Sequence, residues 1–200
     1  MTAQQPAIRR GTNERGVTLI EILVSLVVLA IGLLGIMQLY AAGQTSELEG
    51  QQHSQAMILV NDMVDRINAN RTAAQCYNIT DNAQYTDTDP WVGTGNQTDY
   101  SCSGVDRSAT RKIADQDLGD WDNQLAGDTI QGGGSIVGAR GCIYDNGTDD
   151  SYQIVVAWQG RSMRPDPAVD CAEGEYGGVN NAGESQRRAI SRTVQMADLD

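Results

Sequence analysis

A single carboxylate stands in an otherwise apolar run near the amino terminus. Glu21 lies within Val17 to Met37, a run of 21 residues that contains no Lys, Arg or His. As a helix rising about 1.5 Å per residue, the run would be about 31 Å long, enough to cross a bilayer. A charged side chain in such a segment costs about 2.5–3.5 kcal/mol on insertion scales, so these groups are usually functional and partnered. Glu21 therefore needs either a proton or a cationic partner from outside the run.

Two ordinary kinds of segment explain the amino terminus incompletely. A secretory signal peptide has an apolar stretch of about 7–15 residues and a small-residue cleavage site. Here the stretch is longer, and Leu39 and Tyr40 precede the small residues 41–43. A plain membrane anchor explains the length, and the leader arginines at 9, 10 and 15 favour a cytoplasmic amino terminus. Neither kind of segment explains Glu21.

A third interpretation uses the whole stretch. The sequence Arg15-Gly16-Val17-Thr18-Leu19-Ile20-Glu21, after a short basic leader and before an apolar helix, resembles the class III signal of type IV pilin-like proteins. The resemblance implies cleavage after Gly16 by a prepilin peptidase and methylation of the new amino terminus at Val17. It makes Glu21 the fifth residue of the mature chain. The family most often has Phe after the Gly, and this chain has Val17 instead.

The chemistry of the cut agrees with this resemblance. Cleavage after Gly16 would create a positive α-amino group at Val17. Glu21 lies at the same helix end as that amine, so it is better placed to meet the amine of a neighbouring subunit offset along the axis. In a low dielectric such a pair is favourable only when both charges are present. Glu21 is therefore predicted to set the registry between subunits.

The composition indicates a soluble acidic head on a membrane stem. The precursor has 14 basic and 26 acidic side chains; removing residues 1–16 leaves 11 and 25, a side-chain charge of −14. Such a surface argues against binding nucleic acid or an anionic membrane. The chain has no Phe, so its aromatic core must come from three Trp and seven Tyr.

All four cysteines follow the apolar run, on the side where disulfides persist if the amino terminus is cytoplasmic. Three pairings are possible. We favour Cys76–Cys102 and Cys142–Cys171, because each closes a polar loop that lacks apolar residues of its own. Each such loop adds about 3–4 kcal/mol in the chain-entropy model. A metal site is the alternative, but there is no C-x-x-C and only one His, His53, to which no role is assigned.

The periodicity predicts one helix from about residue 18 to about 69, apolar all round at first and amphipathic in its second half. Residues 73–112 are predicted to be irregular, with Trp91 folded onto the head. A short helix is expected over 114–126, where Leu118, Trp121 and Leu125 recur at helical spacing.

Strands are expected at 136–137, 142–144, 152–158 and 188–196. Together these elements predict an α+β fold in which a long helix packs on an antiparallel sheet of three to four strands, with disulfide-stapled loops. The pilin resemblance implies the same fold. Its domains are a leader (1–16), a transmembrane and filament-core helix (17–40), an amphipathic stem helix (41–70) and an extracytoplasmic head (71–200).

The remaining motifs favour ordinary structure over chemistry. The acidic turn around Asp145 could hold Ca²⁺, but its spacing misses the EF-hand pattern. The Asn-x-Thr sequons at 78, 96 and 146 are treated as chance, and the glycines at 132–134 lack the Lys-Ser/Thr of a phosphate loop. With no catalytic constellation, the chain is predicted to be neither an enzyme nor a holder of cofactors.

The leading functional hypothesis is a minor pilin, because the head (Gly141 to Tyr144, Tyr152 to Gly160, Cys171 and Arg187-Arg188) resembles a minor-pilin subgroup. The resemblance implies partners: prepilin peptidase, other minor pilins, the major pilin and a tip adhesin. It places the head in the periplasm, with the helix in the inner membrane, and later at the pilus tip. A type II secretion pseudopilin, a major pilin and an anchored periplasmic binding protein that never assembles are the alternatives.

Overall fold

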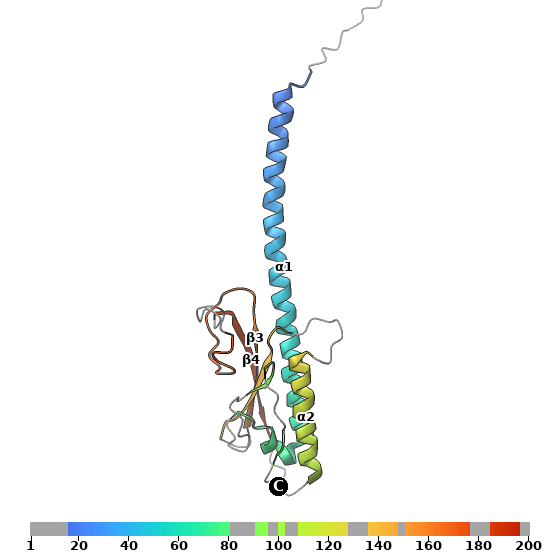
Figure 1. Cartoon of the computed structure of the whole chain (residues 1–200), viewed down its shortest axis with the longest axis vertical. Coiled ribbons are helices and arrows are strands. Elements are labelled where there is room, and N and C mark those ends of the chain that lie inside the picture. The colour runs from blue at the N-terminus through green and yellow to red at the C-terminus, as the bar shows by residue number, and fades with distance from the viewer. Residues whose placement is uncertain are drawn as a thin grey trace, which may run out of the picture. The chain divides into compact units, whose positions relative to one another are not determined.

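The computed structural model describes residues 16–80, 91–95, 100–102, 108–127, 136–147, 151–176 and 185–196. The chain divides into two compact units, one ending at Gln44 and the other starting at Thr45. Helix α1 (Leu19–Ala69) contributes to both units (Figure 1). The other elements belong to the second unit: the 3₁₀ helix η1 (Arg71–Tyr77), β1 (Val92–Gly93), α2 (Ser108–Ala126), β2 (Arg140–Asp145), β3 (Ser151–Gln159) and β4 (Arg187–Gln195).

The first unit contains the apolar part of α1. Every residue from 19 to 44 is exposed, and large side chains such as Leu19 and Leu39 are 85% and 76% exposed. By length and composition this helix could cross a membrane. A helix that is apolar on all sides needs lipid or other helices around it, because water penalises each exposed apolar surface.

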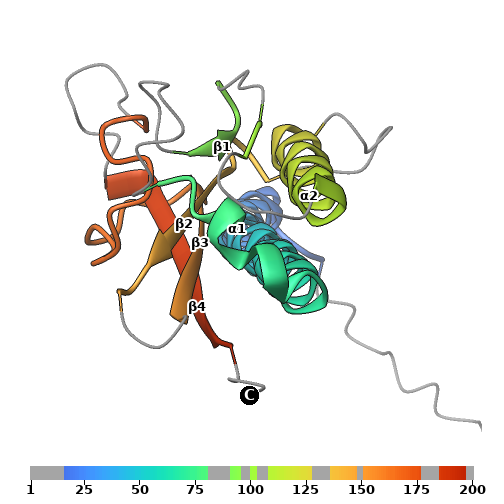
Figure 2. The same ribbon diagram turned by 90° about the horizontal axis from the view of Figure 1, so that it is seen from below.

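The second unit contains a four-stranded antiparallel sheet in the order β1-β2-β3-β4. Its register pairs Ile143 of β2 with Ile154 of β3, and Val156 of β3 with Ile190 of β4. Side chains alternate between the two faces of a strand, so residues 154 and 156 face one side, and 155 and 157 the other. Figure 2 shows the helices beside one face and the orange loop of the β3–β4 connection on the other.

The main core lies between α1 and the sheet. Helix α1 buries residues at three- and four-residue spacing, namely Ala56, Val60, Met63, Val64 and Ile67. They join one apolar cluster with the inward residues of β3, which are Tyr152, Ile154, Val156 and Trp158. This part of α1 is helical because its periodic apolar face is buried against the sheet, while its polar face remains in water.

Helix α2 closes the main core from the side. The indole Nε1 of Trp121 donates a hydrogen bond of 3.1 Å to the carbonyl of Leu59 in α1. The same ring lies against β2 at Gly141, where a Cβ would come within 2.3 Å of it. Gly141 is therefore required by close packing, and Trp121 is wedged between helix and sheet.

A second, smaller core covers the opposite face of the sheet. Val155 and Ala157 of β3 cluster there with Trp91 and with residues of the β3–β4 connection, namely Cys171, Ala172 and Tyr176. The disulfide between Cys142 and Cys171 joins this connection to β2. The second disulfide joins Cys76 of η1 to Cys102. The backbone amide of Cys102 donates to Asp115 of α2, so this bond holds η1 close to α2. Both bonds have the sequential pairing that the sequence favoured.

The structure confirms the predicted α+β class and the long helix, and it corrects three details. The short helix begins at Ser108, not near 114, because residues 108–113 are mostly polar, include no buried side chain and so carry no apolar period. Residues 73–112 are not uniformly irregular, since η1, β1 and the start of α2 lie there. Residues 136–137 are not a strand: Ile136 is irregular and Val137 begins a turn, although the Val137 carbonyl accepts the Gln159 amide at 2.9 Å.

Candidate functional site

The predicted cleavage point lies in non-helical chain. Gly16, Val17 and Thr18 precede α1 and are exposed. The Thr18 carbonyl accepts the backbone amides of Glu21 at 3.1 Å and Ile22 at 3.3 Å, so the helix begins directly after it. A peptidase that binds extended chain could reach the Gly16–Val17 bond without unwinding helical turns.

Glu21 occupies the first turn of α1 and is exposed. The partial positive charge of a helix amino terminus favours a carboxylate there, at about 0.3–1 kcal/mol for an exposed group. The backbone carbonyl of Glu21, not its carboxylate, accepts the Ser25 hydroxyl at 2.7 Å. No ion pair joins the Glu21 carboxylate to any residue in the described part of the chain.

Four small residues in the first part of α1 share a face with Glu21. At 3.6 residues per turn, the five residues lie within about 80° of one another around the helix; they are Glu21, Ser25, Gly32, Gly35 and Gly43. Nothing described lies within 4 Å of the positions where Cβ atoms would stand on these glycines. These glycines therefore pack against no other residue that the structure describes, and they leave the Glu21 face of the helix open to that extent.

Comparison with protein-family models gives one match in this segment. Residues 11–37 match the prokaryotic N-terminal methylation motif. The match supports a type IV pilin-like protein, either a pilin or a pseudopilin. Comparisons with the curated proteins and with the solved structures found no match to the chain.

The long helix, the small antiparallel sheet and the two disulfides are consistent with the type IV pilin fold. Pilin-like proteins are structural and not enzymatic. The motif implies cleavage by prepilin peptidase, anchoring in the membrane, and later assembly with other pilins.

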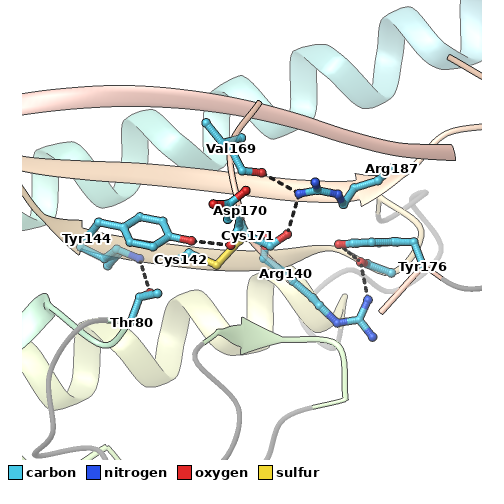
Figure 3. The surroundings of a disulfide bond; sticks show 11 residues. Thr80, Arg140, Cys142, Tyr144, Val169, Asp170, Cys171, Tyr176 and Arg187 are labelled. Carbon is cyan, nitrogen blue, oxygen red and sulfur yellow. Dashed lines mark hydrogen bonds between the residues drawn. A yellow bond between two sulfur atoms is a disulfide. The ribbon is translucent and has the colours of Figure 1, made fainter. Parts of the chain in front are cut away.

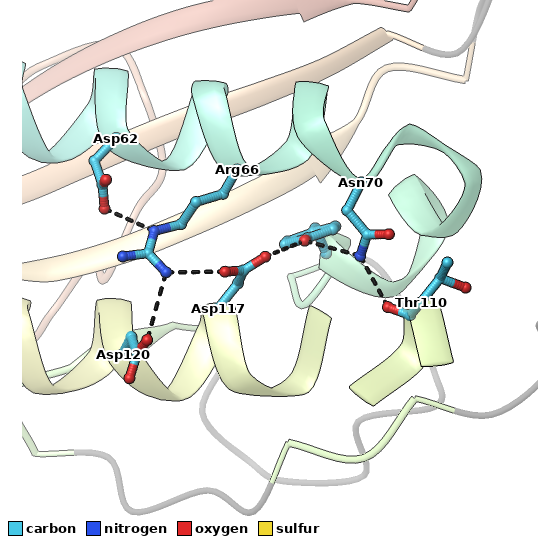
Figure 4. A network of polar contacts seen from close by, with 7 residues as sticks. Asp62, Arg66, Asn70, Thr110, Asp117 and Asp120 are labelled. Atoms are coloured by element: carbon cyan, nitrogen blue, oxygen red, sulfur yellow. Dashed lines mark hydrogen bonds and ion pairs between the residues drawn. The ribbon is translucent and has the colours of Figure 1, made fainter. Parts of the chain in front are cut away.

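The second unit has a polar network where α1 ends (Figure 4). The Arg66 guanidinium donates to Asp62 at 2.8 Å and to Asp117 of α2 at 2.9 Å. Tyr77 donates its hydroxyl to the other oxygen of Asp117 at 2.5 Å. Burial lowers the pKa of Arg66, but the carboxylates of Asp62 and Asp117 have the larger combined effect, so that pKa is raised. Burial and the Asp117 carboxylate both raise the pKa of Tyr77. The network fixes α2 against the end of α1.

Two arginines, Arg187 and Arg140, are buried beside the second core and bind the chain around it (Figure 3). Arg187 of β4 is 1% exposed. It pairs with Asp166 at 2.8 Å and donates to the carbonyls of Val169 at 2.6 Å and Cys171 at 3.2 Å. These contacts fasten the β3–β4 connection across the sheet.

The second of these arginines, Arg140 of β2, lies between two aromatic rings. Its guanidinium carbon is 5.7 Å from the Trp91 ring centroid and 5.0 Å from that of Tyr176. It also pairs with Glu175 at 3.5 Å. Sequence reasoning gave neither Arg140 nor Arg187 a role, because a charged residue in a strand is ordinarily exposed.

The acidic turn at Asp145 and the ring of His53 have ordinary structural contacts. Asp145 accepts the Gly147 amide at 2.8 Å, as a turn residue does, and 148–150 lie outside the described residues. The residues that the structure describes hold no group of three or more His, Cys, Asp or Glu placed for a metal ion. The His53 ring is tilted at 6.1 Å from that of Trp158, a packing contact.

Proposed function

We propose that this chain is a minor pilin of a type IV pilus, that it resembles the minor pilin PilV, and that it is part of the priming and tip complex. In this role it supports pilus assembly, twitching and adhesion. The observation that carries the proposal is the methylation motif at 11–37, whose residues from Leu19 on lie in helix α1 and leave its apolar surface and Glu21 exposed.

In the proposed mechanism the residues act in sequence. Prepilin peptidase cuts after Gly16, in the non-helical chain before α1, and Val17 supplies a free amine that is then methylated. Glu21 pairs with the amine of a neighbouring subunit, which compensates the cost of its charge away from water. The glycines on the Glu21 face let a neighbouring helix approach closely. Residues 1–16 serve as the leader, 17–40 as the membrane and filament-core helix, 41–70 as the stem, and 71–200 as the head.

The head fits a low-copy position outside the cytoplasm. Its two disulfides suit an oxidising compartment, from the periplasm to the pilus tip. Its long polar connections suit a subunit that is not repeated in a tight lattice. Its proposed partners are other minor pilins, the major pilin and a tip adhesin.

Deleting the gene and restoring it from a plasmid tests this function. We expect the deletion strain to lose most surface pili and twitching, and the plasmid to restore both. The strain's type II secretion serves as the second readout. Lost secretion with normal piliation would instead make the chain a pseudopilin, and no change in either would indicate an anchored protein that does not assemble.

A further inference from the structure

The loop Arg161-Ser162-Met163-Arg164, here called the RSMR loop, follows β3 and has an unusual surface. Met163 is 72% exposed, more than any other large apolar side chain described beyond residue 40. A single exposed apolar residue is ordinary. Here, however, exposed cations flank it on both sides, since Arg161 is exposed and the Arg164 side chain is 63% exposed.

The RSMR loop is fixed, so Met163 is held out in solvent. The Glu49 carboxylate of α1 accepts the Ser162 amide at 2.9 Å, the Ser162 hydroxyl at 2.5 Å and an Arg164 N–H at 3.1 Å. The Arg188 guanidinium donates to the Ser162 carbonyl. The Ser162 hydroxyl bond is the largest of the effects that lower the pKa of Glu49, so this carboxylate stays charged near neutral pH.

The loop region carries excess positive charge on an acidic protein. Glu49 faces two arginines, Arg164 and Arg188, and Asp166 offsets the buried Arg187, which leaves Arg161 without an ion pair among the described residues. The Arg164 guanidinium donates to Glu49 from one nitrogen, and its other N–H groups can donate to another acceptor. The rest of the head is acidic, but salt screens exposed charges beyond about 8 Å under physiological conditions. The surface at the RSMR loop therefore attracts anions despite the net charge of −12.

Chain length keeps the RSMR loop near the membrane surface. Its anchor Glu49 comes nine residues after Tyr40, where the proposed membrane segment ends. Nine residues span at most about 30 Å even when fully extended. While the apolar segment is inserted, the loop therefore remains within that reach of the lipid headgroups.

We propose that the RSMR loop binds the anionic phospholipid surface of the membrane that holds the subunit before assembly. Arg161 and Arg164 contact lipid phosphates, and Met163 enters the boundary between headgroups and acyl chains, a pattern typical of interfacial segments. An acidic protein would pair with the arginines but would offer Met163 no apolar layer. The inference rests on the membrane-anchored stage of the proposed function. It gives the head a lipid contact that must break when the subunit leaves the membrane to join the pilus.

Photocrosslinking of the full chain in nanodiscs tests this contact. The photoreactive residue p-benzoylphenylalanine replaces Met163 or, as a control of similar exposure without flanking cations, Ile58 of α1, which is 66% exposed. The nanodiscs contain either phosphatidylcholine alone or an equimolar mixture with phosphatidylglycerol. Mass spectrometry counts the lipid adducts.

We expect adducts at position 163 in the anionic nanodiscs and few at position 58. Arg161→Gln should lower the yield at 163 about five-fold, the usual effect of one Arg at an anionic surface. Arg161 has no hydrogen bond or ion pair among the described residues, so this variant spares the fold.

Equal yields at the two positions, a yield at 163 independent of lipid charge and of Arg161, or crosslinks at 163 to protein alone would overturn the proposal. Such results alongside normal piliation would leave the minor-pilin function intact. Lipid adducts in a chain that never assembles would leave the lipid contact standing without that function.

Discussion

Glu21→Ala is expected to lower incorporation of the chain into fibres by about 100-fold, with processing unchanged. Removing one partner of an ion pair away from water costs about 3–5 kcal/mol, because the other charge is left alone. Here the stranded charge would be the amine of a neighbouring subunit. The registry role proposes a partner in another subunit, and no described residue of the same chain pairs with the Glu21 carboxylate. The measurement is an immunoblot of sheared fibres and membranes.

Two further variants show whether the effect of Glu21→Ala comes from the lost charge, from the changed shape or from any change on this helix face. Glu21→Gln keeps the shape and removes the charge, so it should fail nearly as badly as Glu21→Ala. Ser25→Ala changes a neighbour on the same face, whose hydroxyl is already satisfied by the Glu21 carbonyl, and it should incorporate normally. Wild-type levels of processed Glu21→Ala in fibres would refute the registry role.

Arg187→Met is expected to lower the free energy of unfolding of the head by about 3 kcal/mol. The side chain is 1% exposed, and its loss leaves the carbonyls of Val169 and Cys171 without their donor. Each buried unsatisfied group costs about 1–3 kcal/mol. Asp166 contributes less, because its side chain is 43% exposed and can be solvated. Urea unfolding of the full chain in detergent, followed by Trp fluorescence, measures the loss.

Arg192→Met is the matched control on the same strand. Arg192 is exposed, and among the described residues its side chain donates only to the Asn61 side chain in α1. Removing such a contact should cost under about 1 kcal/mol. An Arg187→Met loss no larger than that of Arg192→Met would show that the second core does not depend on the buried arginine.

The sequence predicted the elements whose own pattern determines them. Helix α1 was expected over about 18–69 and spans Leu19–Ala69, because its apolar positions repeat at helical spacing. Strand β3 was expected over 152–158 and spans Ser151–Gln159, because Ile154, Val156 and Trp158 alternate cleanly. The two disulfides have the pairing that the sequence favoured among the three possible ones, because each closes a polar loop.

The sequence could not show features that depend on partners distant in the chain. Arg187 is buried because carbonyls of the non-periodic β3–β4 connection surround it. Gly141 is required because Trp121 of α2 packs against it. Glu49 looks like one more charge on an exposed helix face, and only the folded chain brings Ser162 to it. The Glu21 site differs in kind, since its predicted partner belongs to another molecule.

The mass of the mature chain tests the central claim most directly. The account predicts that the chain isolated from the membranes or fibres of its own cell begins at Val17 and is heavier by one methyl group. The same chain from a strain without prepilin peptidase should keep residues 1–16. A mature chain that begins elsewhere, for example after the small residues at 41–43, would contradict the pilin assignment and the role of Glu21 with it.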